Sequence, residues 1–394
     1  MNIFNFITST LLFFFLVFVN LFFTQNTKKN TYLLLIAFMI RMFYGFIKHD
    51  FGLPVYYPDA VSFLTSIFNN SVYYGRRDVN FFVKLFSFLA FIFHNEKLLI
   101  LLNVTISNIS IVYIGKISRI IFESRNSEFW TMLLIIISPA YFFYTTDFLR
   151  ENYVLFFIII AVYNFILYLN NGAKKNLFLY FVFSILSGLS RSVNIPILFL
   201  IGFIGILIQK LNSISNFFRK LLYAFTNFLL IILLLGFVLN ILNIHLNLNF
   251  INAQLARDQL NLQNVYLKGF RYENWYELFI FLPIRVLYLL FYPFFWKPSN
   301  YINMTIVTLS SLYYFCSIFL LIIGYRQLKK YLSNNRKANI SIKFIFLFLI
   351  VGICIYAIVK SESGARHSLQ FMWALSIPLG FILEKMEYNF KKLY

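Results

Sequence analysis

Six arginines are the residues of this sequence with the clearest capacity for chemistry. A guanidinium group presents a planar fork of N–H donors that matches the oxygens of a phosphate, and it keeps its charge at any ordinary pH. Gathered in one cavity, such groups could bind a diphosphate and stabilise the charge that develops as it leaves. The six arginines are Arg150, Arg191, Arg257, Arg271, Arg285 and Arg366.

Four carboxylate or imidazole residues could act on a hydroxyl group, and they are Asp50, Asp59, His245 and His367. Either group can orient an attacking hydroxyl or take its proton. Asp59 follows Pro58, and proline often begins a helix, so this carboxylate would lie in a first helical turn where negative charge is favoured. The alternative for Asp59 is a helix-terminal charge in a solvated loop.

Several common catalytic motifs are missing from the sequence. It has no P-loop, no glycine-rich nucleotide fold, no HExxH and no DxD, which argues against a cytosolic nucleotide-sugar substrate. We expect no cofactor, although a Mg²⁺ or Mn²⁺ site assembled from distant loops stays open. Cys316 and Cys354 lie in apolar runs without metal-ligand spacing, so we expect neither a disulfide framework nor a zinc site.

The composition is that of a membrane protein. The chain has 394 residues, of which 60% are hydrophobic and only 12% are charged, and its mean hydropathy is +0.75. Soluble domains carry about 25% charged residues. The net charge of +20 could suggest a nucleic-acid partner, but its distribution between apolar runs is typical of membrane topology instead.

The apolar runs predict an all-α polytopic protein forming one membrane domain over residues 1–394. We expect about eleven spans, within a range of 10–13. Lys28 and Lys29 follow the first run, so the positive-inside rule places the N-terminus outside and the C-terminus in the cytoplasm. The expected spans are 4–23, 31–47, 98–115, 129–146, 152–170, 177–190, 194–209, 221–243, 303–324, 344–358 and 368–384.

Two polar segments are expected on the outer side. Residues 48–96 form a first outer loop, in which the short apolar piece 81–94 predicts an interfacial helix. Residues 244–302 form the main outer loop. Its run 277–296 contains Arg285 and two prolines, so we expect it to lie at the membrane surface or to re-enter without crossing.

Some of the charged residues have structural interpretations of equal weight. Asp147, Arg150 and Glu151 are spaced i, i+3, i+4, so we expect them on one helical face, either as a local ion pair or with Arg150 turned to a phosphate. Arg191 separates two short apolar runs and either lines a polar cavity or extends to the membrane surface. Arg285 would cost about 2.5–3.5 kcal/mol near the bilayer centre, which a partner anion would offset.

The arrangement resembles the Wzy-type O-antigen polymerases of bacterial polysaccharide clusters. The likeness rests on about eleven spans, an enlarged outer loop in the second half and scattered outer arginines. Some members of that family carry Arg-x10-Gly in outer loops. Here Arg257 and Gly269 are one residue too far apart, while Arg191 and Gly202 have that spacing with Gly202 inside an expected span.

Shorter pieces resemble the wider GT-C membrane glycosyltransferases. These pieces are Asp59 in the first outer loop, SPAYFFYTTDFLRE at 138–151, PFFW at 293–296 and SGARHSLQF at 363–371. The resemblance implies a GT-C-like fold and a lipid-linked sugar substrate.

The Wzy-type resemblance implies an enzyme of the bacterial inner membrane that makes lipopolysaccharide O-antigen or capsule. Such an enzyme joins oligosaccharide repeat units carried on undecaprenyl diphosphate at the outer face, beside a flippase and a chain-length regulator. The arginines would bind the diphosphate, and Asp50, Asp59, His245 or His367 would serve the acceptor hydroxyl.

Two other functions are weighed against polymerisation. A GT-C glycosyltransferase would take one sugar from a polyprenyl phosphate and depend above all on Asp59. A polysaccharide flippase or transporter would show two pseudo-symmetric halves and polar residues toward both sides. The sequence shows neither internal repeats nor polar clustering toward the cytoplasm.

Overall fold

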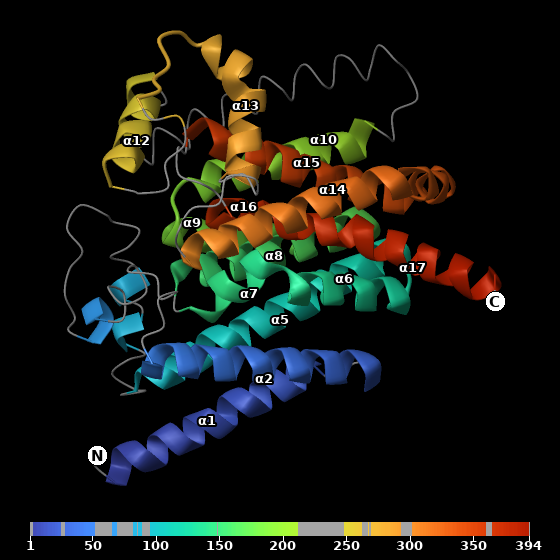
Figure 1. Ribbon diagram of the computed structural model, residues 1–394. Coiled ribbons are helices and arrows are strands. Elements are labelled where there is room, and N and C mark those ends of the chain that lie inside the picture. The colour runs from blue at the N-terminus through green and yellow to red at the C-terminus, as the bar shows by residue number, and fades with distance from the viewer. Residues whose placement is uncertain are drawn as a thin grey trace.

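The described part of the chain is helical and contains no strand. The structure is a computed structural model (Figure 1). It describes residues 3–24, 28–51, 65–68, 82–84, 86–88, 95–147, 149–211, 248–261, 267, 269–292, 302–359 and 365–393. The helices in this part, in chain order, are α1 Ile3–Thr24, α2 Lys28–Phe51, α5 Glu96–Phe122, α6 Arg125–Ile137, α7 Pro139–Thr146, α8 Arg150–Asn171, α9 Lys174–Ser190, α10 Asn194–Leu211, α12 Leu248–Asn261, α13 Glu277–Phe291, α14 Ile302–Asn334, α15 Arg336–Val359, α16 Ala365–Met372, the 3-10 turn η1 Trp373–Leu375, and α17 Ser376–Leu393.

Six of these helices are long and apolar enough to cross a membrane, or up to seven if the bent pair α6 and α7 counts as one span. The described residues therefore confirm a polytopic all-α membrane protein. They do not supply the expected eleven spans, and the expected run 221–243 lies outside them. The six are Lys28–Asp50, Glu96–Phe122, Arg150–Asn171, Asn194–Leu211, Ile306–Asn334 and Arg336–Val359.

Two expected spans are interrupted. Residues 129–146 are not one straight helix, because α6 ends at Ile137 and α7 begins at Pro139, bent by 66°. Proline lacks an N–H and clashes with the preceding turn, so it fits the first turn of a new helix and not a helix interior. The expected run 368–384 is divided between α16, η1 and α17.

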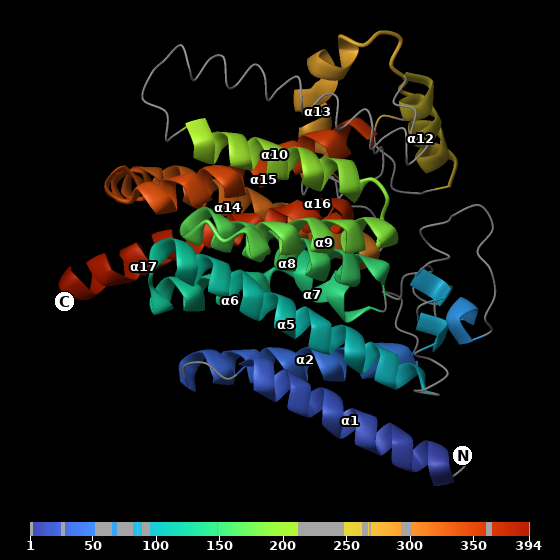
Figure 2. The ribbon, with the colours of Figure 1, turned by 180° about the vertical axis from the view of Figure 1, so that it is seen from behind.

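The long helices lie side by side as a bundle, with α5 near its middle (Figures 1 and 2). Helix α5 packs on α1, α2, α6 and α8. Its ends are well defined, since the Asn95 side chain accepts a hydrogen bond from the N–H of Lys97, and Glu123 closes the helix in the left-handed conformation with φ 54°. Such caps satisfy the backbone groups that a helix end leaves unpaired.

The bundle has two chemically different ends. One end holds the α1–α2, α5–α6, α8–α9 and α14–α15 connections and the C-terminus, and the N-terminus lies at the opposite end (Figures 1 and 2). We call the first the basic end, because it carries the exposed cations Lys28, Lys29, Arg119, Arg125, Lys174, Lys175, Arg326, Lys329, Lys330, Arg336, Lys337 and Lys391.

The opposite end, which we call the junction end, holds the α7–α8, α9–α10 and α15–α16 junctions (Figures 1 and 2). Most of the expected first outer loop, 48–96, lies outside the described residues, and of its expected helix 81–94 only the helical residues 82–84 and 86–88 are described.

Helices α12 and α13, within the expected main outer loop 244–302, form a small unit on the bundle. Ile251, Leu255, Tyr272 and Leu278 make a core of their own. The Asn252 amide fixes the connecting segment, accepting from the N–H of Tyr272 at 2.9 Å and donating to its carbonyl at 2.8 Å. Helix α13 runs across the direction of α14 and α15 and does not lie along them (Figures 1 and 2).

Candidate functional site

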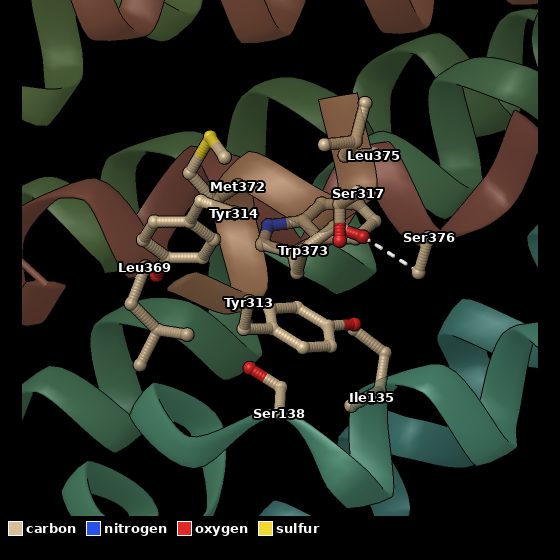
Figure 3. A pocket seen from close by; sticks show the side chains of 10 residues that line it. All are labelled: Ile135, Ser138, Tyr313, Tyr314, Ser317, Leu369, Met372, Trp373, Leu375 and Ser376. Atoms are coloured by element: carbon tan, nitrogen blue, oxygen red, sulfur yellow. Dashed lines mark hydrogen bonds between the residues drawn. The ribbon is translucent and has the colours of Figure 1, made fainter. Parts of the chain in front are cut away.

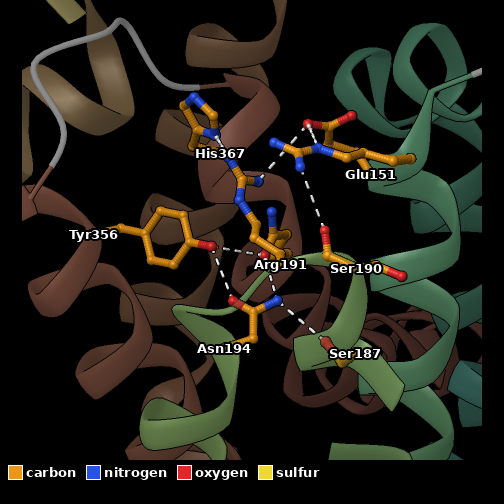
Figure 4. Close-up of polar contacts among 9 residues, drawn as sticks. Glu151, Ser187, Ser190, Arg191, Asn194, Tyr356 and His367 are labelled. Carbon is orange, nitrogen blue, oxygen red and sulfur yellow. Dashed lines mark hydrogen bonds and ion pairs between the residues drawn. The ribbon is translucent and has the colours of Figure 1, made fainter. Parts of the chain in front are cut away.

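A cluster of buried polar side chains lies at the junction end, where several helices begin or end (Figure 4). Burying polar and charged groups is costly unless they are hydrogen-bonded or paired. The cluster is therefore the strongest candidate for a functional site in the described residues. We call it the junction cluster, and its members are Arg150, Glu151, Ser187, Ser190, Arg191, Asn194, Tyr356, His367 and Gln370.

The corner between α9 and α10 positions Arg191. Helix α9 ends at Ser190, and the extended Arg191 donates its N–H to the carbonyls of Ser187 and Gly188 at 3.0 and 3.1 Å. A Cβ on Gly188 would lie 1.8 Å from Cγ1 of Ile195. Only glycine allows this close approach, so the corner folds tightly and directs Arg191 into the bundle.

Arg191 contacts three members of the cluster. Its Nη2–H donates to Nδ1 of His367 at 2.9 Å, and its Nη1 lies 3.8 Å from Oε1 of Glu151. The guanidinium also sits over the Tyr356 ring, 5.5 Å from its centroid. Because arginine can only donate, Nδ1 of His367 must be the acceptor, and the neutral ring carries its proton on Nε2.

Arg150 and Glu151 form the start of helix α8. Nε of Arg150 lies 3.9 Å from Oε1 of Glu151, and its Nη1 donates to the carbonyl of Ser190 at 3.4 Å. Both Arg150 and Arg191 thus share one carboxylate, at distances longer than a direct hydrogen bond. Among the described residues, two guanidinium groups face one carboxylate beside the N-terminus of α8, a position where anions are favoured.

Neutral side chains join the helices around these charges. The Asn194 amide donates to Oγ of Ser187 at 3.1 Å and to Oε1 of Gln370 at 3.2 Å. The Tyr356 hydroxyl lies 2.9 Å from Oδ1 of Asn194 and 3.0 Å from Oε1 of Gln370. Helices α10, α15 and α16 are therefore held together beneath Arg191 and His367.

The structure brings together three of the residues predicted from the sequence, Arg150, Arg191 and His367. The signal in the sequence was the position of each of these residues at the end of an apolar run. Asp59 and His245 lie outside the described residues. Arg257 lies on α12 and Arg366 on α16, and their side chains are outside the described part.

Arg271 and Arg285 lie in and beside the α12–α13 unit. Arg271 is exposed in the segment before α13. Arg285 is fully buried, donates Nε–H to the Ala357 carbonyl at 2.6 Å, and lies 5.2 and 5.4 Å from the ring centroids of Phe270 and Tyr272. Among the described residues, Arg285 thus contacts a backbone carbonyl and two aromatic rings.

Asp50 lies in a partly exposed charge network at the end of α2. Its Oδ2 accepts from Nζ of Lys97 at 2.9 Å, and its Oδ1 is 3.3 Å from Nδ1 of His49. His49 in turn lies 2.8 Å from Oε2 of Glu96. Ion pairs this accessible to water contribute little stability, and these contacts link α2 to α5.

The expectation that Asp147, Arg150 and Glu151 share one helical face is wrong. Asp147 ends α7 in an extended conformation, and α8 begins only at Arg150. The helix break turns Asp147 to another part of the bundle, where it forms a buried ion pair with Lys48 of α2.

Asparagines connect this ion pair to the start of α8. The Asn103 amide donates to the carbonyls of Thr145 and Asp147, both at 2.7 Å. The Asn152 amide donates to the Asn103 carbonyl at 2.7 Å. Because Asn152 follows Glu151 in α8, this lysine–aspartate network and the junction cluster adjoin through one helix.

Glu151 was considered from the sequence only as part of an ion pair, and five residues of the cluster were missed, namely Ser187, Ser190, Asn194, Tyr356 and Gln370. Gln370 follows His367 by three positions in α16, so the two share a helical face. That spacing was a usable signal. Nothing in the sequence marked Asn194 or Tyr356, which bond each other across 162 positions, while Asn194 also bonds Gln370 across 176 positions.

A small cavity lies beside α16 and is too small to be a substrate site (Figure 3). Its volume is about 10 Å³, room for about one water molecule. Trp373 lines the cavity, and its Nε1–H donates to the carbonyl of Gln370 at 2.9 Å. The cavity is therefore adjacent to the junction cluster. The cavity is lined by Ile135, Ser138, Tyr313, Tyr314, Ser317, Leu369, Met372, Trp373, Leu375 and Ser376.

Among the residues that the structure describes, no group of three or more histidine, cysteine, aspartate or glutamate side chains could hold a metal ion.

Comparisons with known proteins add no relative. No family model matches the chain, and no curated protein or solved structure matches it either.

Proposed function

We propose that this protein polymerises oligosaccharide repeat units carried on undecaprenyl diphosphate, and that the junction cluster is its active site. The observation that supports the proposal is the buried set of Arg150, Glu151, Arg191 and His367. Polar groups buried among membrane-spanning helices are costly and commonly serve a function.

The proposed orientation follows from the distribution of positive charge. Cytoplasmic ends of membrane proteins carry an excess of lysine and arginine. The basic end, with the C-terminus, would then face the cytoplasm of a bacterium, and the junction end, with the N-terminus, would face the periplasm. In this proposal the full chain has eleven spans in a GT-C-like arrangement, and repeat units are joined at the outer face of the inner membrane.

Arg150 and Arg191 would bind the diphosphate of the donor. Each guanidinium lies 3.8–3.9 Å from the Glu151 carboxylate, close enough for charge balance yet too far for a direct hydrogen bond. A diphosphate oxygen could take up those N–H groups in two-pronged contacts. As the sugar–phosphate bond breaks, the same donors would stabilise the charge on the leaving diphosphate.

His367 would act as a hydrogen-bond donor and Glu151 as the proton acceptor. With Nδ1 held by Arg191, neutral His367 has its proton on Nε2 and acts as a donor. It would therefore orient the leaving diphosphate or the acceptor sugar. Glu151 is the carboxylate of the cluster and would take the proton of the acceptor hydroxyl.

The experiment is a gene deletion in the native host, with the surface glycolipid separated on a gel. We expect the long-chain ladder to disappear and one complete repeat unit to remain on its carrier. A truncated repeat would instead indicate a glycosyltransferase, and complete repeats trapped in the cytoplasm would indicate a flippase. An unchanged ladder would contradict all three functions.

Complementation with point variants connects the result to the cluster. Arg191→Ala should fail to restore the ladder, since loss of one donor to a developing charge costs about 100-fold or more in rate. Arg326→Ala is the matched control, because Arg326 is exposed at the basic end and lies outside the cluster. Equal ladders from the two variants, at equal protein levels in the membrane, would remove the cluster from the mechanism.

A further inference from the structure

Helix α13 carries a stripe of large apolar side chains that the bundle does not cover. Ile280, Ile284 and Leu287 recur at helical spacing and are 62%, 47% and 51% exposed, and Tyr276, the residue just before the helix, extends the stripe and is 60% exposed. Phe279 flanks the stripe and is 77% exposed. A contiguous exposed surface of this kind marks an interaction site in a folded protein.

The opposite face of α13 is fixed to the bundle by Arg285. Its Nε–H donates to the Ala357 carbonyl at 2.6 Å. Ala357 lies in the last turn of α15, which ends at Val359. The last four carbonyls of a helix have no intrahelical partner, and a cation there is favoured by the helix dipole. Held by this contact, the helix must turn its apolar stripe away from α15.

The stripe continues onto the exposed surface of α14. The ring of Phe291, at the end of α13, contacts the ring of Phe315 with centroids 6.5 Å apart. Phe315 is 52% exposed, and the exposed Leu309 and Leu312 precede it on α14. Helix α14 is long and apolar enough to span a membrane, so its exposed apolar side chains face lipid.

We propose that α13 lies in the plane of the membrane, in the leaflet at the junction end, with its apolar stripe among the acyl chains of the lipids. Its direction across α14 and α15 agrees with that position (Figures 1 and 2). An amphipathic helix at a bilayer surface buries its apolar face in this way. The occupant of the stripe is bilayer lipid, which already covers the adjoining face of α14.

The residues before α13 mark the level of the headgroups. Trp275 is 52% exposed, and tryptophan and tyrosine rings are enriched where the bilayer meets water. Glu273 and Asn274 are exposed beside it. The Glu277 carboxylate accepts from the N–H of Glu273 at 2.9 Å, and this bond lowers the pKa of Glu277. Charged Glu277 therefore keeps the helix start at the water side.

The test measures how deep single labels on α13 lie. Cys316 and Cys354 are first replaced by serine, and an environment-sensitive fluorophore is attached to Phe279→Cys or Ile284→Cys in the full chain. The protein is reconstituted in vesicles of phosphatidylethanolamine and phosphatidylglycerol. Quenching by a lipid with a nitroxide on its acyl chain is compared with quenching by aqueous iodide.

Two positions on α14 supply matched references. Phe319 is 56% exposed within the span, and Asn334 is exposed at its end. We expect labels at 279 and 284 to be quenched by the nitroxide lipid as strongly as the label at 319, and to resist iodide. Iodide quenching equal to that at 334 would overturn the inference. Protection from both quenchers would also overturn it, because protein would then cover the stripe.

Discussion

Several cations at the two ends of the bundle lie in opposite environments. At the basic end the cations named above are exposed, and Glu387 accepts hydrogen bonds from Lys391, four positions away, and from Trp130 of α6. At the junction end Lys48, Arg150 and Arg191 are buried. An exposed cation is solvated by water, whereas a buried one depends on the protein for every partner.

This difference shows where the sequence is constrained. Exposed lysines can orient a membrane protein through their number alone, so any one of them is replaceable. Buried charges act through specific geometry, and removing one partner leaves the other without compensation. Substitutions should therefore have graded effects, large at the junction end and small at the basic end.

The largest effect on stability is expected from Asp147→Ala. This change leaves the buried Lys48 ammonium without its carboxylate partner, and losing one side of a buried pair costs about 3–5 kcal/mol. Thermal unfolding of the detergent-solubilised full chain would measure the loss. The double variant Lys48→Met with Asp147→Leu removes both charges and should recover much of it. Equal destabilisation by the single and double variants would show that the pairing itself is unimportant.

The next effect is on activity and rests on the proposed function. Glu151→Gln removes the proton acceptor but keeps the size of the side chain, so polymerisation should slow by about 100-fold or more. Binding of undecaprenyl diphosphate should be unchanged or tighter, because the positive excess of Arg150 and Arg191 increases. Both quantities can be measured on reconstituted protein. Full activity in the variant would reduce Glu151 to a charge-balancing role.

A smaller effect is expected from Arg285→Met, which removes the contact between α13 and the last turn of α15. Hydrogen bonds made by charged groups contribute about 1.5–3 kcal/mol, and the thermal unfolding midpoint should fall accordingly. Arg271→Met is the control, since the Arg271 side chain is exposed. An identical midpoint for both variants would mean that Arg285 does not hold α13 in place.

The comparison also explains how much could be predicted from the sequence. Hydropathy identified most of the long helices, because burial in lipid demands apolar runs. Arg150, Arg191 and His367 stood out as charged or polar residues at the ends of such runs. The basic connectors likewise indicated which helix ends lie together.

The pairing of these groups could not be predicted from spacing. Asp147 stands three residues before Arg150, yet its partner is Lys48, 99 positions away. The break between α7 and α8 decides that outcome, and it depends on how α2 packs against α7. The contact of Arg285 with the last turn of α15 likewise could not be predicted from spacing, because Ala357 lies 72 positions away.

The smallest effect is expected at the basic end, from Glu387→Gln. Hydrogen bonds from Lys391 at 2.6 Å and from Trp130 at 2.9 Å lower the pKa of Glu387 below its ordinary value of 4.5. A carboxylate whose pKa is lower in the folded state than in the unfolded state stabilises the fold at pH values above its unfolded-state pKa. That stabilisation is lost as the pH falls through the folded-state pKa. Because the pair is accessible to water, its contribution should stay below about 1 kcal/mol.

Unfolding midpoints of wild type and Glu387→Gln, compared at neutral pH and at a pH below the folded pKa of Glu387, would test this difference between the ends. The variant should be slightly less stable at neutral pH and indistinguishable in acid, and its glycolipid ladder should be normal. A loss at neutral pH as large as that of Asp147→Ala would show that the basic end is constrained as tightly as the junction end. Burial of a charged side chain would then not distinguish the residues that matter for stability and activity from those that do not.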